Sequence, residues 1–216
     1  MTRRFDAVLF DMDGVLVDSE PMHLETARAL FGEYGVPYSD EENARHFGRT
    51  DAEMFRDMLA KHQLPVSVDE MVRRRTEIVV KRTWEDPHPM DGVPDVLHAL
   101  HAAGYRFALA SASAVPVIEA TLGALDVRAL FDVVVSGLVV GRGKPAPDIF
   151  LEAAQQLAVA PAACVVVEDS RNGLLAAKAA GMACVSIPCP ATMREDFSEA
   201  DYRFGCLREL LTLLAR

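Results

Sequence analysis

The sequence lacks the features that several large classes of protein require. Among its 216 residues, no apolar run approaches the roughly 20 residues of a membrane-spanning helix, so we expect no membrane insertion. Positive charge is scarce, and the formal net charge of -10 argues against binding to the phosphate backbone of nucleic acids. The sequence shows no internal repeat and no low-complexity tract, so neither a repeat array nor a disordered chain is indicated.

Cysteine is also scarce, and its spacing excludes a paired-cysteine motif. The four cysteines form no C-x-x-C pair, and Cys164 and Cys184 lie in apolar, strand-like runs typical of core residues. The basic start, 1–4, is followed by only a few apolar residues, which is too short for a secretory signal. We therefore expect a location in the reducing cytoplasm.

Hydrophobic residues make up half of the chain and charged residues a quarter, which suits an ordinary globular core. Helical spacing of apolar residues dominates 18–88, where Ser39, Thr50 and Ser67 each precede a glutamate by three residues, as in capping boxes. The basic run 73–75 in this region is expected to form a solvated helix face. We predict an all-helical domain over 18–88, inserted into a discontinuous core of 1–17 and 89–216.

The remainder of the sequence alternates between apolar strands and helices. Strands are predicted at 7–10, 105–110, 131–135, 163–167 and 183–187. Helices are predicted between them, and a last one over 207–215. Continuous apolar strands alternating with helices indicate an α/β fold, with a Rossmann-like parallel sheet covered by helices on both faces.

Polar residues follow four of these strands, directly at the strand end or, after the third strand, in the loop that begins there. They are Asp11, Asp13, Ser111, Lys144, Glu168 and Asp169. In a parallel sheet these exits share one edge, so we expect the side chains to converge. Carboxylate oxygens suit Mg²⁺, whereas lysine and serine suit phosphate oxygens. Each residue alone could be a helix cap or a solvated side chain, but the ordered set predicts a Mg²⁺ site beside a phosphate site.

The same segments carry a family resemblance that spans almost the whole chain. The matching motifs, in order, are 11–20, 110–113, 143–150, 167–173 and 176–182. Together they resemble the haloacid dehalogenase-like hydrolases, in the subgroup that has a helical cap after the first motif. The resemblance implies a phosphoryl-transfer enzyme that acts on small phosphorylated metabolites, sugar phosphates among them, and uses Mg²⁺.

The resemblance also implies roles for individual residues. Asp11 would be the nucleophile that forms an aspartyl-phosphate, and Asp13 the general acid and then base. The phosphate-binding residues would be Ser111, Ala112 and Lys144. The metal ligands would be Asp11, Asp13 through its backbone carbonyl, Glu168 and Asp169. In the cap, the resemblance points to His23 near the hinge and to Gly48 and Arg49 in a loop over the site.

Three reactions or roles remain open at this stage. A phosphatase passes the phosphoryl group to water, whereas a β-phosphoglucomutase-type enzyme passes it to a sugar hydroxyl. The mutases usually have a basic residue and an asparagine where Ala114 and Val115 stand, so we favour the phosphatase. A phospho-acceptor signalling domain is a further alternative, but such domains have no helical insertion after the first strand. The sequence does not indicate an oligomeric state.

Overall fold

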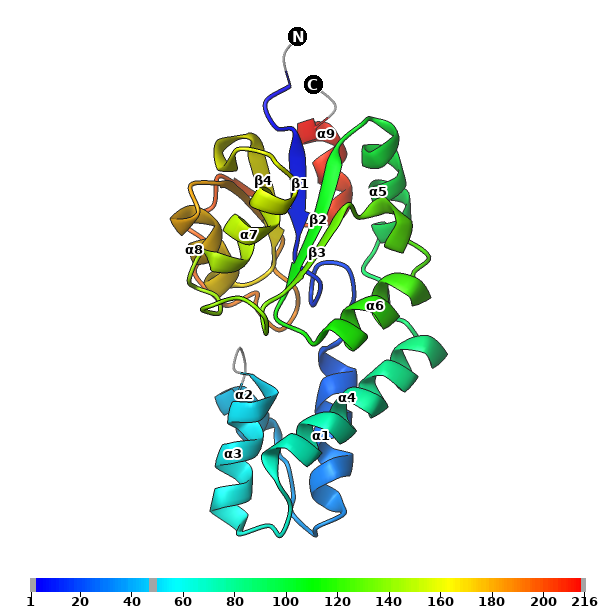
Figure 1. The fold of residues 1–216 in the computed structure, drawn as a ribbon, viewed down its shortest axis with the longest axis vertical. Coiled ribbons are helices and arrows are strands. Elements are labelled where there is room, and N and C mark those ends of the chain that lie inside the picture. The colour runs from blue at the N-terminus through cyan, green and yellow to red at the C-terminus, as the bar shows by residue number, and fades with distance from the viewer. Residues whose placement is uncertain (1–2, 47–49, 215–216) are drawn as a thin grey trace.

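The computed structural model describes residues 3–46 and 50–214, and its centre is a parallel sheet (Figure 1). Six strands pair in the order β3-β2-β1-β4-β5-β6, and all five pairings are parallel. The strands are β1 (Ala7–Phe10), β2 (Arg106–Ser111), β3 (Val133–Ser136), β4 (Cys164–Glu168), β5 (Ala183–Ser186) and β6 (Tyr202–Arg203). The predicted α/β class is thereby confirmed.

The central strand β1 shows why these sequences form strands rather than helices. Its side chains alternate between the two faces of the sheet: Val8 and Phe10 join one buried apolar cluster, and Ala7 and Leu9 join the other. All four residues are fully buried, since helices cover both faces. A strand buried on both sides needs continuous apolar sequence, which is the pattern that predicted it.

Helices flank the sheet on both faces (Figure 1). On one face, apolar residues of α5 (Val93–Ala102), α6 (Val115–Ala124) and α9 (Leu210–Leu214) share a cluster with the sheet. On the other face the cluster is shared with α7 (Asp148–Gln156) and α8 (Arg171–Ala179). Short 3-10 turns at Arg128–Leu130, Pro161–Ala163 and Leu207–Glu209 complete this part of the fold.

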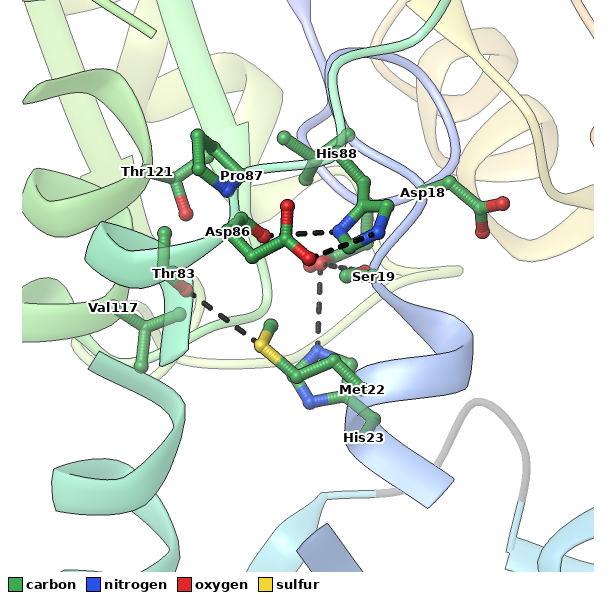
Figure 2. A pocket seen from close by; sticks show the side chains of 12 residues that line it. Asp18, Ser19, Met22, His23, Thr83, Asp86, Pro87, His88, Val117 and Thr121 are labelled. Atoms are coloured by element: carbon green, nitrogen blue, oxygen red, sulfur yellow. Dashed lines mark hydrogen bonds and ion pairs between the residues drawn. The ribbon is translucent and has the colours of Figure 1, made fainter. Parts of the chain in front are cut away.

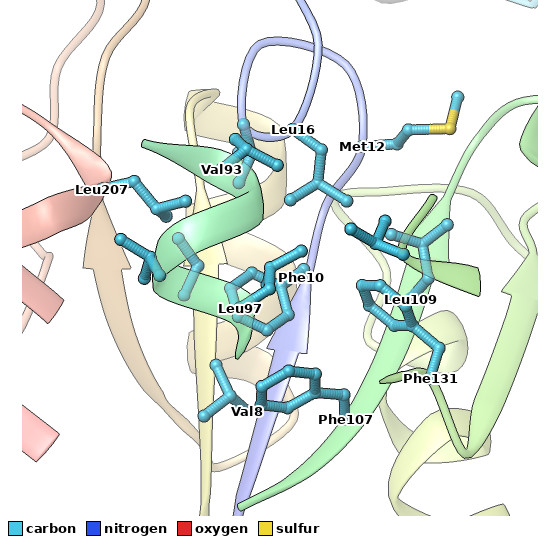
Figure 3. Packing of buried hydrophobic residues seen from close by; sticks show 14 of the residues in the cluster. Val8, Phe10, Met12, Leu16, Val93, Leu97, Phe107, Leu109, Phe131 and Leu207 are labelled. Atoms are coloured by element: carbon cyan, nitrogen blue, oxygen red, sulfur yellow. The ribbon is translucent and has the colours of Figure 1, made fainter. Parts of the chain in front are cut away.

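Three aromatic rings pack together in the first of these clusters (Figure 3). Phe107 is fully buried, and its ring centroid lies 5.2 Å from that of Phe10 and 5.8 Å from that of Phe131. We expect Phe107→Ala to lower the free energy of unfolding by about 3–5 kcal/mol, because it removes buried area and leaves a cavity. Urea denaturation measures this loss.

The matched control is a truncation at an exposed apolar residue. Val139 is 75% exposed, so Val139→Ala should change the free energy of unfolding by less than about 0.5 kcal/mol. A loss of less than about 1 kcal/mol for Phe107→Ala would show that this ring is not part of a tightly packed core.

The remaining four helices form a second group at the carboxyl end of the sheet (Figure 1). They are α1 (Glu20–Gly32), α2 (Asp40–His46), α3 (Asp51–His62) and α4 (Val68–Glu85). They enclose an apolar cluster of their own, in which Phe31, Phe55 and Met58 are buried. The inserted helical cap is thus present, while its boundaries at 17/18 and 88/89 stay a prediction.

Two chain segments that run side by side connect this cap to the sheet. The Asp18 amide donates to the carbonyl of His88 at 2.9 Å, and the Met90 amide donates to that of Leu16 at 3.0 Å. Between them, Val17 and Pro89 form an antiparallel bridge. The cap is therefore tied to the core at a two-strand hinge beside the first motif.

Several local expectations differ from the structure. Strand β6 was not predicted because two residues give no readable pattern, and the C-terminal helix is α9 preceded by a 3-10 turn. Thr50 forms the full capping box with Glu53. Ser39 and Ser67 form only half of such a box, in which the serine hydroxyl accepts a hydrogen bond from the backbone amide three residues later. In the described part of the chain no helix is both long and apolar enough to cross a membrane. The cytoplasmic location stays a prediction.

The arginine run 73–75 is only partly the solvated face that we expected. Arg73 is exposed and pairs with Glu70, but Arg75 is 7% exposed. Arg75 points inward because its position on α4 falls on the face that packs in the cap. There its Nε lies 2.9 Å from Asp51 Oδ2, and its Nη1 donates to the carbonyl of His23.

Candidate active site

The predicted site residues of the core motifs meet at the carboxyl edge of the sheet. The register aligns Phe10 with Leu109 of β2 and with Val167 of β4, so the residues after these positions leave the sheet at one level. Asp11 follows β1, Ser111 ends β2, and Glu168 ends β4. The topology thus brings together residues that lie up to about 160 positions apart in the sequence.

Three carboxylates and one ammonium form the centre of the site. One ligand-type oxygen each from Asp11, Glu168 and Asp169 lies within 4.8 Å of the others, and all three residues are buried. Lys144 Nζ donates to Asp11 Oδ1 at 2.5 Å and to Glu168 Oε1 at 2.6 Å. When all four groups are ionised, three carboxylates and one ammonium carry two net negative charges, so the hard oxygen donors fit a divalent cation such as Mg²⁺.

The pKa values of this cluster shift because like charges share a buried space. Burial raises the pKa of Asp11 well above its ordinary value, against the pull of Lys144, and the charges of Glu168 and Asp169 raise it further. Burial alone would lower the pKa of Lys144, but the charges of Asp11 and Glu168 raise it above its ordinary value. The lysine is therefore a permanent cation in the site.

Two glycines allow the backbone to approach the carboxylates closely. Gly14 has a φ of +78°, and a Cβ there would lie 2.2 Å from Asp169 Oδ2. A Cβ at Gly173 would lie 1.8 Å from Glu168 Cδ. Glu168 is also held by Ser170, whose hydroxyl and amide donate to Oε2 at 2.9 and 3.1 Å.

Asp13 lies in a different environment from Asp11, two residues away. Its Oδ1 accepts from Ser19 Oγ at 2.5 Å, and its Oδ2 accepts from Ser113 Oγ at 3.0 Å. His23 Nε2 lies 3.6 Å from Oδ1. Burial alone would raise the pKa of Asp13, but His23 and the two serine hydroxyls hold it below its ordinary value.

A small pocket lies at the hinge between sheet and cap (Figure 2), and Asp13 is one of the residues that line it. Met22 and His23 of α1 face the segment that carries Asp86 and His88. The pocket has a volume of about 20 Å³, enough for one water molecule. His23 Nδ1 is buried and has no hydrogen-bond partner among the described residues.

The predicted phosphate-binding residues lie next to Asp11 and Asp13. Ser111 is fully buried, and its Oγ accepts from the amide of Ser113 at 3.0 Å. Ala112 is exposed between them, and Lys144 Nζ also donates to the carbonyl of Ala110 at 3.1 Å. Among the predicted cap residues, only His23 can be placed. Gly48 and Arg49 lie outside the described residues.

Sequence reasoning missed five side chains that contact the acidic residues. Ser19, Ser113 and Ser170 are parts of the recognised motifs, so their spacing from Asp13 and Glu168 could have pointed to them. Cys189 and Thr192, which contact Asp169, lie in a loop after β5 that carries no recognisable motif. That contact is visible only once the chain has folded.

Comparisons with known proteins identify the same family that the sequence motifs resemble. The model of the haloacid dehalogenase-like hydrolases matches residues 5–181. Fructose-1-phosphate phosphatase YqaB of Escherichia coli is 35% identical over 188 residues, which cover 87% of this chain and 98% of that protein. Protein CbbY of Cereibacter sphaeroides is 34% identical over 215 residues, 95% of this chain and 94% of that protein.

A solved structure extends this likeness to the whole fold. The crystal structure of CbbY from Rhodobacter sphaeroides in complex with phosphate has a TM-score of 0.89 and 32% identity. The match covers 98% of this chain and 100% of that one. The chain therefore belongs to the haloacid dehalogenase-like hydrolases, and it is a phosphoric monoester hydrolase of that family.

Proposed function

We propose that the enzyme hydrolyses small phosphorylated metabolites, sugar phosphates in particular, through an aspartyl-phosphate on Asp11. The observation that carries this proposal is the separation of the two aspartates. Asp11 faces Lys144 and the buried carboxylates, whereas Asp13 faces two serine hydroxyls and His23. Two neighbouring acids in different environments are suited to different tasks, one to attack and one to move a proton.

In the first half of the reaction, a carboxylate oxygen of Asp11 attacks phosphorus and the bond to the sugar oxygen breaks. Lys144 would offset negative charge on the phosphoryl oxygens, and Ser111 would bind one of them. Asp13 gives a proton to the leaving oxygen. An incoming phosphate dianion raises the pKa of a neighbouring carboxyl, so substrate binding itself favours the protonated form of Asp13.

In the second half, water attacks the phosphorus of the aspartyl-phosphate. Asp13, now a carboxylate, accepts a proton from this water, and the P–O bond to Asp11 breaks. Inorganic phosphate leaves, and both aspartates return to their starting states. The hydrogen bonds from Ser19 and Ser113 hold the carboxylate of Asp13 in place for both proton transfers.

The residues that would hold Mg²⁺ are Asp11, Glu168, Asp169 and the backbone carbonyl of Asp13. Support comes from the three clustered carboxylates and from their uncompensated charge. When bound, Mg²⁺ would keep Asp11 ionised despite the pKa that burial raises, and it would shield Asp11 from the charge of the approaching phosphate. The cap would exclude water while the phosphoryl group passes to Asp11, with His23 at the hinge. The family resemblance also assigns Gly48 and Arg49 to binding the rest of the substrate.

A screen of phosphorylated metabolites with Mg²⁺ tests the proposal. The assay should record both free phosphate and isomerised sugar phosphate, with Asp11→Asn as the control. We expect Mg²⁺-dependent phosphate release from one or more sugar phosphates by the wild-type enzyme. Release that does not need Mg²⁺, or that the variant retains, would contradict the mechanism.

The same screen separates the mutase alternative. β-Glucose 1-phosphate with a bisphosphate primer should yield phosphate and little glucose 6-phosphate, because Ala114 and Val115 supply no polar side chain beside the phosphate. Glucose 6-phosphate as the main product would favour the mutase. A signalling domain would instead keep a long-lived phospho-Asp11, so rapid turnover excludes that alternative.

Proton release on Mg²⁺ binding is a further expected result. Burial raises the pKa of Asp169 to about 7, and the charge of Glu168 adds to the effect. A raised carboxyl pKa means that the metal-free enzyme carries a proton there below pH 7. Mg²⁺ must displace it, so affinity should fall as the pH drops below 7, by up to about tenfold per pH unit.

Calorimetry at pH 6.5 in two buffers of different ionisation enthalpy measures this proton release. Asp196 provides the control, because the amide of Ser198 and the guanidinium of Arg171 hold its pKa at about 2 at the surface. Asp196→Asn should keep the wild-type dependence on pH. A Mg²⁺ affinity that is constant between pH 6 and 8 would contradict the prediction.

A further inference from the structure

The loop that follows β5 reaches across to the acidic cluster. Cys189 Sγ donates to Asp169 Oδ2 at 3.1 Å, and Thr192 Oγ1 lies 3.4 Å from the same oxygen. Thr192 is 1% exposed although it is polar, so its hydroxyl faces protein rather than solvent. Both side chains therefore contact the same carboxylate oxygen of a residue in the candidate metal site.

Hydrogen bonds within the loop restrict the positions of these two side chains. The amide of Cys189 donates to Thr192 Oγ1 at 3.1 Å, and the amide of Thr192 donates to the carbonyl of Cys189 at 3.1 Å. Because Thr192 Oγ1 accepts from the amide of Cys189, its own proton is available for a second hydrogen bond. The carboxylate of Asp169 is a stronger acceptor for that proton than the carbonyl of Cys189. Pro188 and Pro190 flank Cys189 and restrict the backbone there.

The start of the loop is tied to the backbone of Glu168, the other acidic residue of the motif. The amide of Ile187 donates to the carbonyl of Glu168 at 2.8 Å, which places the loop directly beside Asp169. The same oxygen, Asp169 Oδ2, also lies so close to Gly14 that no Cβ would fit there. Two segments far apart in the sequence thus crowd one oxygen of Asp169, and the rotation of its carboxylate is restricted.

We propose that Cys189 and Thr192 are positioning residues for Asp169, and that they fix the rotation of its carboxylate for metal binding. The inference rests on the proposed Mg²⁺ dependence. Glu168 is held from within its own motif by Ser170, but Asp169 depends on a loop about twenty residues further along the chain. The loss of such outer partners commonly weakens metal binding by 10- to 100-fold.

The test measures Mg²⁺ binding by calorimetry, independently of turnover. The Cys189→Ala/Thr192→Val double variant should raise the Kd for Mg²⁺ by about tenfold or more. The single variant Thr192→Ser, with Cys189 unchanged, keeps the hydroxyl. Its Kd for Mg²⁺ should stay within about threefold of the wild-type value. At saturating Mg²⁺, kcat should change less than the Kd does, since the two residues do not touch the phosphoryl group.

Thr26→Val is the matched control. Thr26 is also a fully buried threonine, but it lies in the cap, where its Oγ1 donates to the carbonyl of Met22. This variant should leave the Kd for Mg²⁺ unchanged. An unchanged Kd in a folded double variant, or an equal rise in Thr26→Val, would overturn the inference. If the wild-type enzyme does not bind Mg²⁺, the metal dependence in the proposed function fails, and the inference fails with it.

Discussion

Asp11→Asn is expected to lower kcat/KM toward the best substrate of the screen by about 10⁴-fold or more, since an amide cannot act as the nucleophile. Asparagine has almost the same size as aspartate, so the fold should persist. The change also removes a charge that faces Lys144 Nζ at 2.5 Å. A loss of activity alone would therefore not separate a nucleophile from an electrostatic partner.

Trapping the intermediate makes that separation. Wild-type enzyme quenched in acid during turnover should carry one phosphoryl group on the peptide that contains Asp11, and mass spectrometry detects it. Asp11→Asn should carry none. Asp196→Asn, at an exposed carboxylate paired with Arg171, is the control and should behave like wild type. Phosphoryl transfer to a different residue, or more than about a tenth of wild-type activity in Asp11→Asn, would exclude the proposed nucleophile.

The fold was predictable because its signals are local. The apolar run of β1 is buried on both faces of the sheet, and the polar residues that end it lie at the sheet edge. Strands of this kind separated by helices can adopt only a few sheet topologies once their pairing is taken to be parallel. Strand β6 gave no signal because a pair at the sheet edge needs only two residues and a neighbouring strand.

The candidate site was predictable only where contacts follow from a motif. Lys144 and Asp11 are 133 positions apart, yet Asp11 directly follows β1 and Lys144 lies in the loop that follows β3, so the topology brings both to the same edge of the sheet. The hydroxyl of Thr192 has no such marker. Its contact with Asp169 depends on the path of a loop between two prolines, and the sequence pattern does not specify that path.

Arg75 shows how the same limit applies to charge. Three consecutive arginines look alike in a sequence, but a helix turns by about 100° per residue, so consecutive side chains point in different directions. Arg73 faces solvent and pairs with Glu70, whereas Arg75 faces Asp51 inside the cap. Only the packing of α4 against its neighbours decides which of the three is buried.

Among substitutions outside the acidic residues, we expect Gly173→Ala to cause the largest loss of kcat/KM and of Mg²⁺ affinity. Gly173 is the third residue of α8, where alanine would ordinarily favour the helix by about 1 kcal/mol. In this structure the added Cβ would lie 1.8 Å from both Cδ and Oε1 of Glu168. No carbon can occupy that position, so either the carboxylate or the helix start has to move.

The carboxylate has little room to move. Glu168 is fully buried, its Oε1 accepts from Lys144 and its Oε2 accepts from Ser170, whose hydroxyl in turn accepts from the amide of Gly173. A displacement of about 1 Å at a catalytic group can cost about 100-fold in rate. We expect a loss of at least that size in kcat/KM, together with a Kd for Mg²⁺ that is raised by about tenfold or more.

Gly32→Ala is the control that isolates the close approach from the general effect of glycine. Gly32 ends α1, and a Cβ there would meet no atom within 4 Å. Gly32→Ala should keep full activity and an equal or higher melting temperature, since alanine favours a helix. Wild-type Mg²⁺ affinity in Gly173→Ala would mean that Glu168 tolerates displacement, and it would remove this carboxylate from the proposed metal ligands. A loss of Mg²⁺ binding in Gly173→Ala alone would instead tie the glycine of the last motif to the position of Glu168.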